Sequence, residues 1–469
     1  MSELPNGWVD IAIGEISDVI AGGTPKANDA SNFALPGKGI AWLTPADLSG
    51  YKQKEISKGS RDLSQKGYDS CSAKLMPKGS LLFSSRAPIG YVALAANEIS
   101  TNQGFKSFVF PEEVDPTYAF FFLKSIRELA DSLGTGTTFK ELSGATAKTL
   151  PFRLAPTNEQ IRIAQKLDEL LAQVDTLKAR IDAIPVLLKR FRQSVLASAT
   201  SGRLTEEWRA HRISREITAE QTCGDGSFPP DWKVRPLKKL VTKIEQGWSP
   251  KCESVSASDD EWAVIKTTAI QPISFGPLEN KKLPTTLLPR PELSIVIGDI
   301  LITRAGPRSR AAVCCYVKAT QPKLMVCDKA YRFRAIEEEF SGLLLCYFLN
   351  SPQFVRALDD LKTGISESGV NLTMKKFQDL ELPQPPTEEQ TEIVRRVEQL
   401  FAFADQLEAK VASAKSRIDH LTQSILAKAF RGELVPQDPN DEPASVLLKR
   451  IKAQRAAAPK AKRGRKVSA

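Results

Sequence analysis

Few residues in this 469-residue chain have the types and spacing that catalysis needs. Only two histidines occur, His211 and His420, and neither lies in a stretch that reads as globular, which excludes a histidine base or metal site there. The sequence has no Gly-x-x-x-x-Gly-Lys-[Ser/Thr] phosphate loop and no Asn/Asp-Pro-Pro-Tyr/Phe run of the kind that amino-methyltransferases use. A nuclease-like set can be drawn only from Asp259 or Asp260 with Glu279–Lys281, a pattern that arises easily by chance. We therefore expect no catalytic residue and no metal ligand.

Loops rich in Lys, Arg, Asn, Gln, Ser and Thr are better candidates for a site, because these side chains hydrogen-bond to base edges and phosphates. The candidate DNA-binding residues of the first half are Gly23, Thr24, Lys26, Ser85, Arg86, Asn102, Gln103, Lys106, Thr137 and Lys140. Those of the second half are Gln246, Trp248, Lys251, Lys266, Thr268, Arg304, Arg308, Arg310, Thr363 and Asn371. Gly, Thr and Asn are also ordinary turn residues, so any one loop could be a plain turn. Arg86 and Arg304 follow similar strand patterns in the two halves and are the first choices.

The net charge of +10 does not by itself indicate a nucleic-acid-binding body. Nine Lys and Arg residues and no acidic residue lie in 443–469, so the rest of the chain is close to neutral. The basic tail is expected to be a solvated end that attracts phosphates without sequence preference, with a short amphipathic helix around Val446, Leu447 and Ile451 just before it. Any DNA-binding surface in the body must therefore be a local patch.

The sequence repeats itself at a period of about 225–230 residues. Gly22–Lys26 corresponds to Gln246–Lys251, and Pro156-Thr-Asn-Glu-Gln corresponds to Pro386-Thr-Glu-Glu-Gln. Near the end of each half, Gln-Ser-Val-Leu-Ala is answered by Gln-Ser-Ile-Leu-Ala. A duplicated chain predicts two similar halves related by a pseudo-two-fold axis, which matches the two-fold symmetry of B-DNA.

Each half closes with a long helix. Thr157 and Thr387 stand where N-caps belong, a Gln three residues later completes a capping box, and Gly202 and Gly432 are natural stops. Apolar residues recur at 4,3 steps over more than four heptads, which is typical of a coiled coil. The seam is predicted to contain Leu167, Leu170, Val174, Leu177 and Ile181 in the first helix and Val397, Leu400, Leu407, Val411 and Ile418 in the second.

Each helix should have about 42 residues and a length of about 60 Å, which exceeds a domain of this size. We therefore expect the two helices to pack on each other, although each could instead pack on its own domain. Pro185 should kink the first helix or break its hydrogen-bond ladder locally.

The remaining segments predict two mixed α+β domains, because short β-rich runs are followed by one helical stretch. The runs are 80–84, 91–95 and 105–110, then 295–303 and 312–317; the helical stretches are 117–132 and 341–362. The predicted organisation is a first globular domain 1–155, a first long helix 156–203, a loose polar linker 204–227, a second globular domain 228–385, a second long helix 386–432 and a basic tail 433–469.

Seven cysteines, an odd number without any Cys-x-x-Cys, argue against a disulfide framework or a zinc site and favour a reducing compartment. No stretch of 18 apolar residues occurs, and the start lacks a basic segment followed by an apolar run. We therefore expect no membrane span, no signal peptide and a cytoplasmic location.

The duplication, the Pro-Thr-x-Glu-Gln helix starts and the Gln-Ser-[Val/Ile]-Leu-Ala closings resemble the specificity subunits of type I restriction–modification systems. Segments 189–193 and 426–434 are similar to the conserved regions of the IA branch. The resemblance covers nearly the whole chain, and it is carried by the long-helix motifs. The globular domains match in layout more than in letters.

The resemblance implies that each globular domain is a target-recognition domain for one half of a split site in double-stranded DNA. It implies that the two helices form an antiparallel coiled coil that spaces these domains. Two adenine-methyltransferase subunits would bind the helices, and two restriction subunits with motor and nuclease activity would join them. S-adenosylmethionine, Mg²⁺ and ATP would belong to those partners, so no cofactor is expected in this chain.

Two other functions are compatible with parts of the sequence. One is a magnesium-dependent DNA nuclease built on the acidic residues named above, which a plasmid-cutting assay with the purified chain would reveal. The other is a coiled-coil adaptor that binds only proteins, which a DNA shift assay with the methyltransferase present would separate from a DNA-binding subunit.

Overall fold

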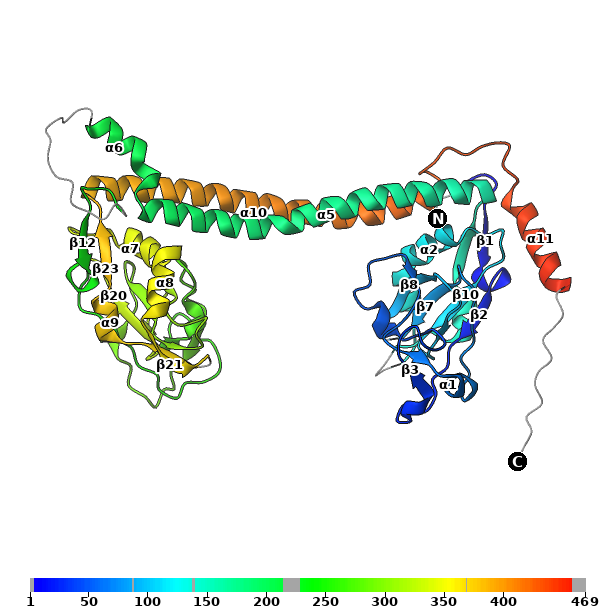
Figure 1. The fold of residues 1–469 in the computed structure, drawn as a ribbon, viewed down its shortest axis with the longest axis horizontal. Helices are drawn as coiled ribbons and strands as arrows, with labels where there is room; N and C mark the ends of the chain where they lie inside the picture. Colours follow the sequence, from blue (N-terminus) through cyan, green and yellow to red (C-terminus); the bar gives the residue numbers. More distant parts are fainter. Residues whose placement is uncertain (1–3, 87, 137–139, 214–227, 368, 458–469) are drawn as a thin grey trace. The chain divides into compact units, whose positions relative to one another are not determined.

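The computed structural model describes residues 4–86, 88–136, 140–213, 228–367 and 369–457. Thr137, the later part of the expected linker and the end of the basic tail lie outside the described residues. The chain divides into two compact units, residues 1–181 with 413–469 and residues 182–412 (Figure 1). Each unit therefore holds one globular domain together with a stretch of each long helix.

A five-stranded sheet of order β2-β10-β7-β8-β5 forms the centre of unit 1. Its strands are β2 (Asp18–Ala21), β10 (Lys106–Val109), β7 (Leu81–Ser85), β8 (Ile89–Ala95) and β5 (Glu55–Ile56), and only the β5–β8 pair is parallel. Smaller pairs are β1 (Val9–Ala12) with β11 (Pro151–Leu154), β3 (Phe33–Ala34) with β6 (Asp62–Leu63), and β4 (Trp42–Leu43) parallel to β9 (Ser100–Thr101). The short helices are α1 (Gln65–Asp69), α2 (Pro116–Ser125), α3 (Arg127–Ser132) and α4 (Gly144–Lys148), with 3-10 turns at Ile13–Glu15, Ala30–Asn32 and Pro45–Leu48.

Unit 2 repeats this plan with a four-stranded sheet of order β13-β20-β16-β18. These strands are β13 (Glu245–Gln246), β20 (Ala330–Phe333), β16 (Ile300–Thr303) and β18 (Cys314–Tyr316). A two-stranded sheet pairs β12 (Lys233–Pro236) with β23 (Glu381–Gln384). In a three-stranded sheet, β14 (Ala263–Ile265) lies between β15 (Asn280–Lys282) and the parallel β19 (Leu324–Met325). In another, β22 (Gly369–Leu372) lies between β17 (Ala305–Gly306) and β21 (Lys362–Ser366). The helices are α7 (Gly342–Leu349), α8 (Pro352–Asp360) and α9 (Met374–Gln378), with 3-10 turns at Leu237–Lys239, Thr267–Ala269 and Pro291–Leu293.

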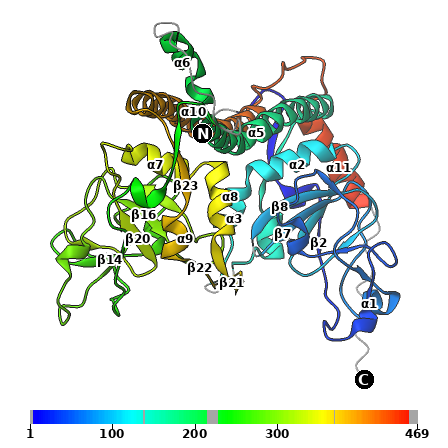
Figure 2. The same cartoon turned by 60° about the vertical axis from the view of Figure 1, so that its left-hand side comes forward.

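Helix α2 lies beside the sheet of unit 1 and helix α7 beside that of unit 2 (Figure 2). Buried aromatic side chains of these sheets and helices contribute to the core of each unit. In unit 1, Phe83 and Phe108 of the sheet pack with Tyr118 of α2, and Phe430 beyond the second long helix joins this core. Each such ring contributes about 1.5–3 kcal/mol on burial. The long helices are thus part of the domain cores and not separate from them.

Each expected helical stretch after the sheet is two helices in the structure. The break falls at Ile126 in unit 1 and at Asn350 with Ser351 in unit 2. In unit 2 the second helix begins with Pro352, which starts a helix well but cannot continue one.

The long helices are α5 (Thr157–Thr200) and α10 (Thr387–Ala429), and in unit 2 they run antiparallel. Arg192 of α5 pairs with Asp405 at 2.6 Å, whereas the carbonyl of Leu204, which follows α5, accepts a hydrogen bond from Arg396 at 2.8 Å. Later residues along α5 therefore meet earlier residues of α10.

Most residues predicted for the seam are buried or half-buried, whereas Leu177 is exposed. Leu167, Val174, Val397 and Ile418 are buried, and Leu170, Ile181, Leu400, Leu407 and Val411 are half-buried. Leu177 is 47% exposed, and its neighbour Lys178 pairs instead with Asp419 at 2.6 Å.

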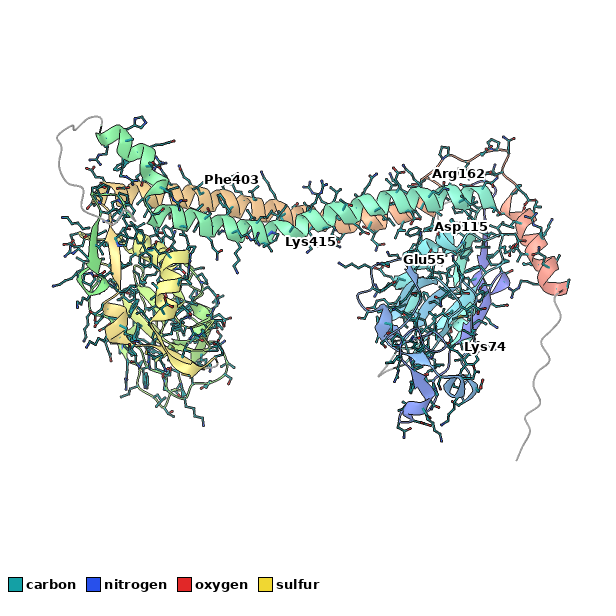
Figure 3. The ribbon with its side chains drawn as sticks, in the orientation of Figure 1. Glu55, Lys74, Asp115, Arg162, Phe403 and Lys415 are labelled. Carbon is teal, nitrogen blue, oxygen red and sulfur yellow. The ribbon has the colours of Figure 1, made fainter. Side chains whose placement is uncertain are left out.

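The expected capping boxes at the two helix starts are wrong. Thr157 and Thr387 are themselves the first helical residues. Gln160 donates to the carbonyl of Ala155 at 2.8 Å and accepts from the backbone N–H of Asp115 at 3.0 Å. Gln390 makes the equivalent pair of bonds in unit 2. Each Gln therefore ties its helix to the adjoining domain, as the position of Asp115 below the start of α5 illustrates (Figure 3).

Helix α5 continues through Pro185, where the sequence predicted a kink or a local break of the hydrogen-bond ladder. The proline lacks an N–H and removes one bond, to the carbonyl of Ile181, where the division between the two units falls. Gly202 and Gly432 adopt φ values of 76° and 73° past the two helix ends, the left-handed conformation expected of a stop.

The expected loose linker begins with regular structure, a 3-10 turn (Arg203–Thr205) followed by α6 (Glu206–Ile213). The tail likewise contains α11 (Ala444–Ala457), with Leu447 and Ile451 buried in the core of unit 1 and Val446 exposed. Among the described helices, none is long and apolar enough to cross a membrane. The six cysteines of the described residues are free thiols.

Candidate DNA interface

In unit 1, the Gly-Gly-Thr-Pro-Lys loop after β2 lies against the Thr-Asn-Gln-Gly turn before β10. The N–H of Gly23 donates to the carbonyl of Thr101 at 2.9 Å. The hydroxyl of Thr24 donates to Oε1 of Gln103. Lys26, the last residue of the loop, is exposed beside them. Two loops that were separate candidates in the sequence thus form one surface.

Unit 2 has the same arrangement of loop and turn, formed by different residue types. The N–H of Trp248 donates to the carbonyl of Val326 at 3.0 Å. The hydroxyl of Ser249 donates to Oδ1 of Asp328. Lys251 is exposed, as its counterpart is in unit 1. The duplication therefore extends to the contacts between these loops.

The glycine before each of these loops is required by a close backbone approach. A Cβ on Gly22 would lie 2.0 Å from the carbonyl oxygen of Asn102. A Cβ on Gly247 would lie 2.2 Å from that of Val326. Any side chain at either position would push the loop off the turn that it contacts.

The end of the central strand fixes the other side of each turn. The N–H of Ser85 donates to the carbonyl of Gly104 at 2.7 Å, and the N–H of Arg304 donates to that of Lys329 at 2.8 Å. Ser85 and Arg304 are therefore the equivalent residues, whereas the sequence had matched Arg86 with Arg304. Ser85 is buried, and its hydroxyl has no hydrogen-bond partner among the described residues. Burial argues against its predicted contact with DNA.

Arg304 is held in place beside the turn of unit 2. Its Nε donates to the carbonyl of Asp328 at 2.8 Å, and its guanidinium lies 5.8 Å from the ring centre of Tyr331. Asn371 in β22 pairs with Ala305, the next residue along the chain, so it lies near Arg304. Thr363 belongs to the same hairpin, and its hydroxyl donates to the carbonyl of Asn371 at 3.1 Å.

Several candidate cations are already engaged within the protein. The side chain of Lys106 is only 11% exposed and pairs with Glu141 at 3.3 Å. Arg310 donates to two backbone carbonyls at 2.8 Å each, and Arg308 pairs with Asp359 at 2.6 Å. These contacts argue against direct DNA binding by Lys106 and Arg310, because their donors are used to hold loops together.

The remaining candidates of unit 1 lie near the end of β7. Arg86 forms an isolated bridge with Glu141, next to Lys140, which pairs with Asp131 at 3.0 Å. Asn102 accepts from the N–H of Gly104 at 2.8 Å and so shapes its turn. Its side chain is therefore a structural element of the loop.

A pocket of about 350 Å³ adjoins the turn of unit 2. It is lined by Ser249, Pro250, Cys252, Val264, Ile265, Lys266, Thr267, Lys281, Cys327, Asp328 and Lys329. Burial raises the pKa of the Cys252 thiol. Three of these lining residues are lysines, and they form a local basic patch of the kind that a neutral body requires to bind DNA.

The sequence reasoning missed Asp328 and Lys329 as members of this site, and took Lys281 only as part of an acidic motif. Asp328 stands about 225 residues after Gln103, so a register taken from the repeat would have found it. Glu279 accepts a hydrogen bond from the Thr268 hydroxyl at 2.7 Å, and its carboxylate lies 3.7 Å from the ammonium group of Lys266. Glu279 therefore contacts Lys266 of the basic patch. Nothing supports the nuclease alternative.

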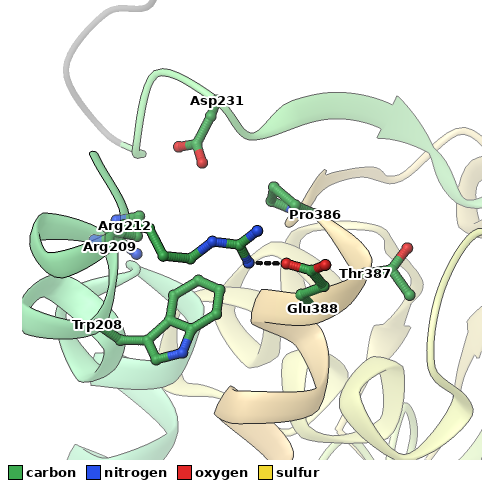
Figure 4. Close-up of a pocket in the computed structure, with 7 residues that line it drawn as sticks. All are labelled: Trp208, Arg209, Arg212, Asp231, Pro386, Thr387 and Glu388. Carbon is green, nitrogen blue, oxygen red and sulfur yellow. Dashed lines mark ion pairs between the residues drawn. The ribbon is translucent and has the colours of Figure 1, made fainter. Parts of the chain in front are cut away.

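Another pocket of unit 2, of about 500 Å³, lies between α6 and the start of α10 (Figure 4). Arg212 crosses it to pair with Glu388 and lies 4.9 Å from the ring centre of Trp208. Arg209 pairs with the buried Glu389. Because Arg212 and Glu388 pair across it, this pocket is a contact between α6 and the start of α10.

The glutamates at the starts of α5 and α10 are equivalent, but their surroundings differ. Glu159 accepts from the indole N–H of Trp8, and Glu389 from that of Trp232, both at 2.9 Å. Glu389 also accepts from Arg209, whereas Oε1 of Glu159 has no partner among the described residues. Burial therefore raises the pKa of Glu159.

Within the part of the chain that the structure describes, no three His, Cys, Asp or Glu side chains are grouped so that they could hold a metal ion. The arrangement that recurs in both units is instead a loop, a turn and an exposed lysine. These groups can hydrogen-bond to bases and phosphates.

Two similar α+β domains are each joined to both of the long helices. This arrangement defines a duplicated DNA-recognition protein. The family called "Type I restriction modification DNA specificity domain" matches residues 5–186 and 229–414, and the chain belongs to this family. It is a specificity subunit of a type I restriction–modification system, with DNA sequence recognition as its role.

Curated relatives extend over the full length of the chain. The specificity subunit of the type I restriction enzyme EcoKI from Escherichia coli (strain K12) is 30% identical over 99% of both chains. That of StySPI from Salmonella potsdam is also 30% identical over 99% of both. That of MjaIX from Methanocaldococcus jannaschii is 36% identical over 53% of this chain and 54% of its own.

Solved structures show the same fold. The HsdS subunit from Thermoanaerobacter tengcongensis has a TM-score of 0.55 at 19% identity and covers 92% of this chain and 98% of its own. A chain from a structure titled for complex assembly and conformational transition of the type I R-M system has a TM-score of 0.61 at 18% identity, over 92% and 100%.

Proposed function

We propose that this chain recognises a bipartite DNA site, with one globular domain for each half, and catalyses no reaction itself. The observation that carries the proposal is the duplicated contact of a loop with a turn, because the same framework holds different side chains in the two units. Different side chains on one framework allow two different half-sites to be read.

The proposal includes partner subunits that supply the chemistry. Two adenine-methyltransferase subunits would bind the long helices, and two restriction subunits would complete the nuclease. S-adenosylmethionine, Mg²⁺ and ATP would be bound by these partners. This part rests on family membership and on the two-fold duplication, which offers similar faces to two copies of one partner.

Exchange of residues 1–150 for the matching part of another specificity subunit tests the proposal. The expected result, in a host that also expresses the methyltransferase, is a methylation map in which one half-site changes and the other is retained. A change in both halves would contradict the independence of the two domains. Methyl transfer by the purified chain with S-adenosylmethionine alone would contradict its non-catalytic role.

A further inference from the structure

Gln103 and Asp328 are equivalent residues with opposite hydrogen-bonding character. Each stands third in the turn that the central strand fixes, and each accepts a hydroxyl hydrogen bond from the facing loop, from Thr24 in unit 1 and from Ser249 in unit 2. The hydroxyl holds one end of each side chain. The geometry of the turn is therefore conserved between the units while the chemistry is not.

The unengaged end of each side chain is a different kind of group. Counting only partners among the described residues, Nε2 of Gln103 makes no hydrogen bond, and neither does Oδ2 of Asp328. The side chain of Gln103 is exposed and that of Asp328 is half-buried at the edge of the pocket. Unit 1 thus presents an amide, and unit 2 presents a carboxylate oxygen that can only accept.

A carboxylate in this position is unfavourable for simple attraction of DNA. Asp328 shares its pocket with Lys266, Lys281 and Lys329, which suit phosphate groups. An acidic group among them repels the same phosphates. It can, however, accept a hydrogen bond from the N4 amine of cytosine. A glutamine pairs with adenine when its Nε2 donates to N7 and its Oε1 accepts from N6, and Oε1 of Gln103 keeps a second lone pair for this contact beside its bond with Thr24.

We infer that Gln103 and Asp328 are specificity-determining residues that each read one base, adenine by Gln103 and cytosine by Asp328. The inference rests on the proposed function, and it adds which residue reads which class of base edge. Thr24 and Ser249 act as positioning residues, because each holds one oxygen of the reading side chain by a hydrogen bond.

The test is a methylation map of a host that expresses the chain with its methyltransferase. The variants Asp328→Asn and Gln103→Glu should each relax or switch one base position, in different half-sites, and leave the other half unchanged. A single bidentate or amine contact predicts a loss of discrimination at that position of about 5- to 100-fold. Asp328→Gln should shift preference at its position from cytosine toward adenine.

Two further variants separate base reading from local structure. Ser249→Ala removes the hydroxyl contact but keeps the carboxylate, so it should weaken binding and keep the same preferred base. Asp260→Asn removes an equal charge from an exposed position of the same domain and should leave the site unchanged. A base change caused by Ser249→Ala or Asp260→Asn would overturn the assignment.

The outcomes distinguish this inference from the proposed function. An unchanged bipartite site in both Asp328→Asn and Gln103→Glu would overturn the inference and leave the proposed function standing. A wild-type chain that directs methylation to no bipartite site would overturn both. Urea unfolding of each variant identifies any that fold poorly. For those, the same positions are tested with the variants Asp328→Glu and Gln103→Asn. Asp328→Glu should keep the same preferred base, and Gln103→Asn should lose discrimination at its position.

Discussion

At the scale of single residues, the two buried glutamates show how one sequence motif acquires two electrostatic settings. Both receive an indole hydrogen bond, but only Glu389 is also paired with an arginine. Glu159 is held with one oxygen unpaired, so the folded state carries the cost of a desolvated charge. The pKa of Glu159 is raised above its usual value of 4.5 for this reason.

The substitution Glu389→Gln should destabilise the protein by about 2–4 kcal/mol, because it leaves the largely buried Arg209 without its charged partner. The matched Glu159→Gln should change stability by about 1 kcal/mol or less. Urea unfolding of both variants measures the difference. Equal losses would show that the arginine pair does not stabilise unit 2.

The raised pKa of Glu159 also predicts a dependence on pH. The unfavourable charge is present above the raised pKa and disappears as the pH falls through it, so the wild type gains stability relative to Glu159→Gln on acidification. The Glu159→Gln variant should therefore be slightly more stable than the wild type at neutral pH, and this difference in free energy of unfolding should narrow as the pH falls from about 7.5 toward the usual glutamate pKa of 4.5. A difference that widens would contradict the assignment.

Residue types alone could not separate exposed from buried members of the candidate site. Gly23, Thr24 and Gln103 were predicted from loop letters, and the structure brings them together. Ser85 and Lys106 are also residue types that suit contacts with DNA. However, Ser85 ends the buried strand β7 and Lys106 begins the buried strand β10, so their side chains face the interior. The missing information is which residue of a strand end turns inward, and this depends on packing from distant segments.

At the scale of elements, the two long helices were predicted to within a few residues. Threonine starts, glycine stops and heptad spacing are local signals, so they survive without knowledge of the tertiary structure. The order of strands in the sheets is set by contacts far apart in sequence, and the sequence did not predict it. Leu177 was predicted for the seam, but it is 47% exposed.

The substitutions Leu167→Ala and Leu177→Ala form a matched pair on one helix. Leu167 is fully buried and its truncation should cost about 2–5 kcal/mol, whereas that of the exposed Leu177 should cost less than about 0.5 kcal/mol. Thermal and urea unfolding measure both. A large loss at Leu177 would show that this side chain is covered within the folded chain.

At the scale of the whole molecule, the duplication makes the helix pair a candidate ruler for the gap between half-sites. Insertion of one heptad after Leu177 and another after Leu407 keeps the apolar residues of each helix on the same face, and it lengthens both helices by about 10 Å. At roughly 3.4 Å per base pair, the preferred gap should grow by about three base pairs. Affinity should fall, because about three base pairs rotate one half-site by nearly a third of a turn.

Methylation mapping of this double insertion is the measurement. The two half-sites should be retained with a longer gap between them. Insertion of four residues into α5 alone is the control, since it breaks the register and should weaken assembly with the methyltransferase. Full methylation at the original spacing in the double insertion would show that the helices do not set the gap.

The pocket beside Asp328 contains a natural chemical reporter. Cys252 is a half-exposed thiol on its wall, whereas Cys314, Cys315 and Cys346 are buried in the domain. Its raised pKa makes it react slowly with maleimide near neutral pH and faster as the pH rises. A bound duplex over the lysines should shield it, so mass-spectrometric labelling of Cys252 should slow in the presence of cognate DNA. The folded chain would then report occupancy of its second domain through a native thiol, without an engineered cysteine.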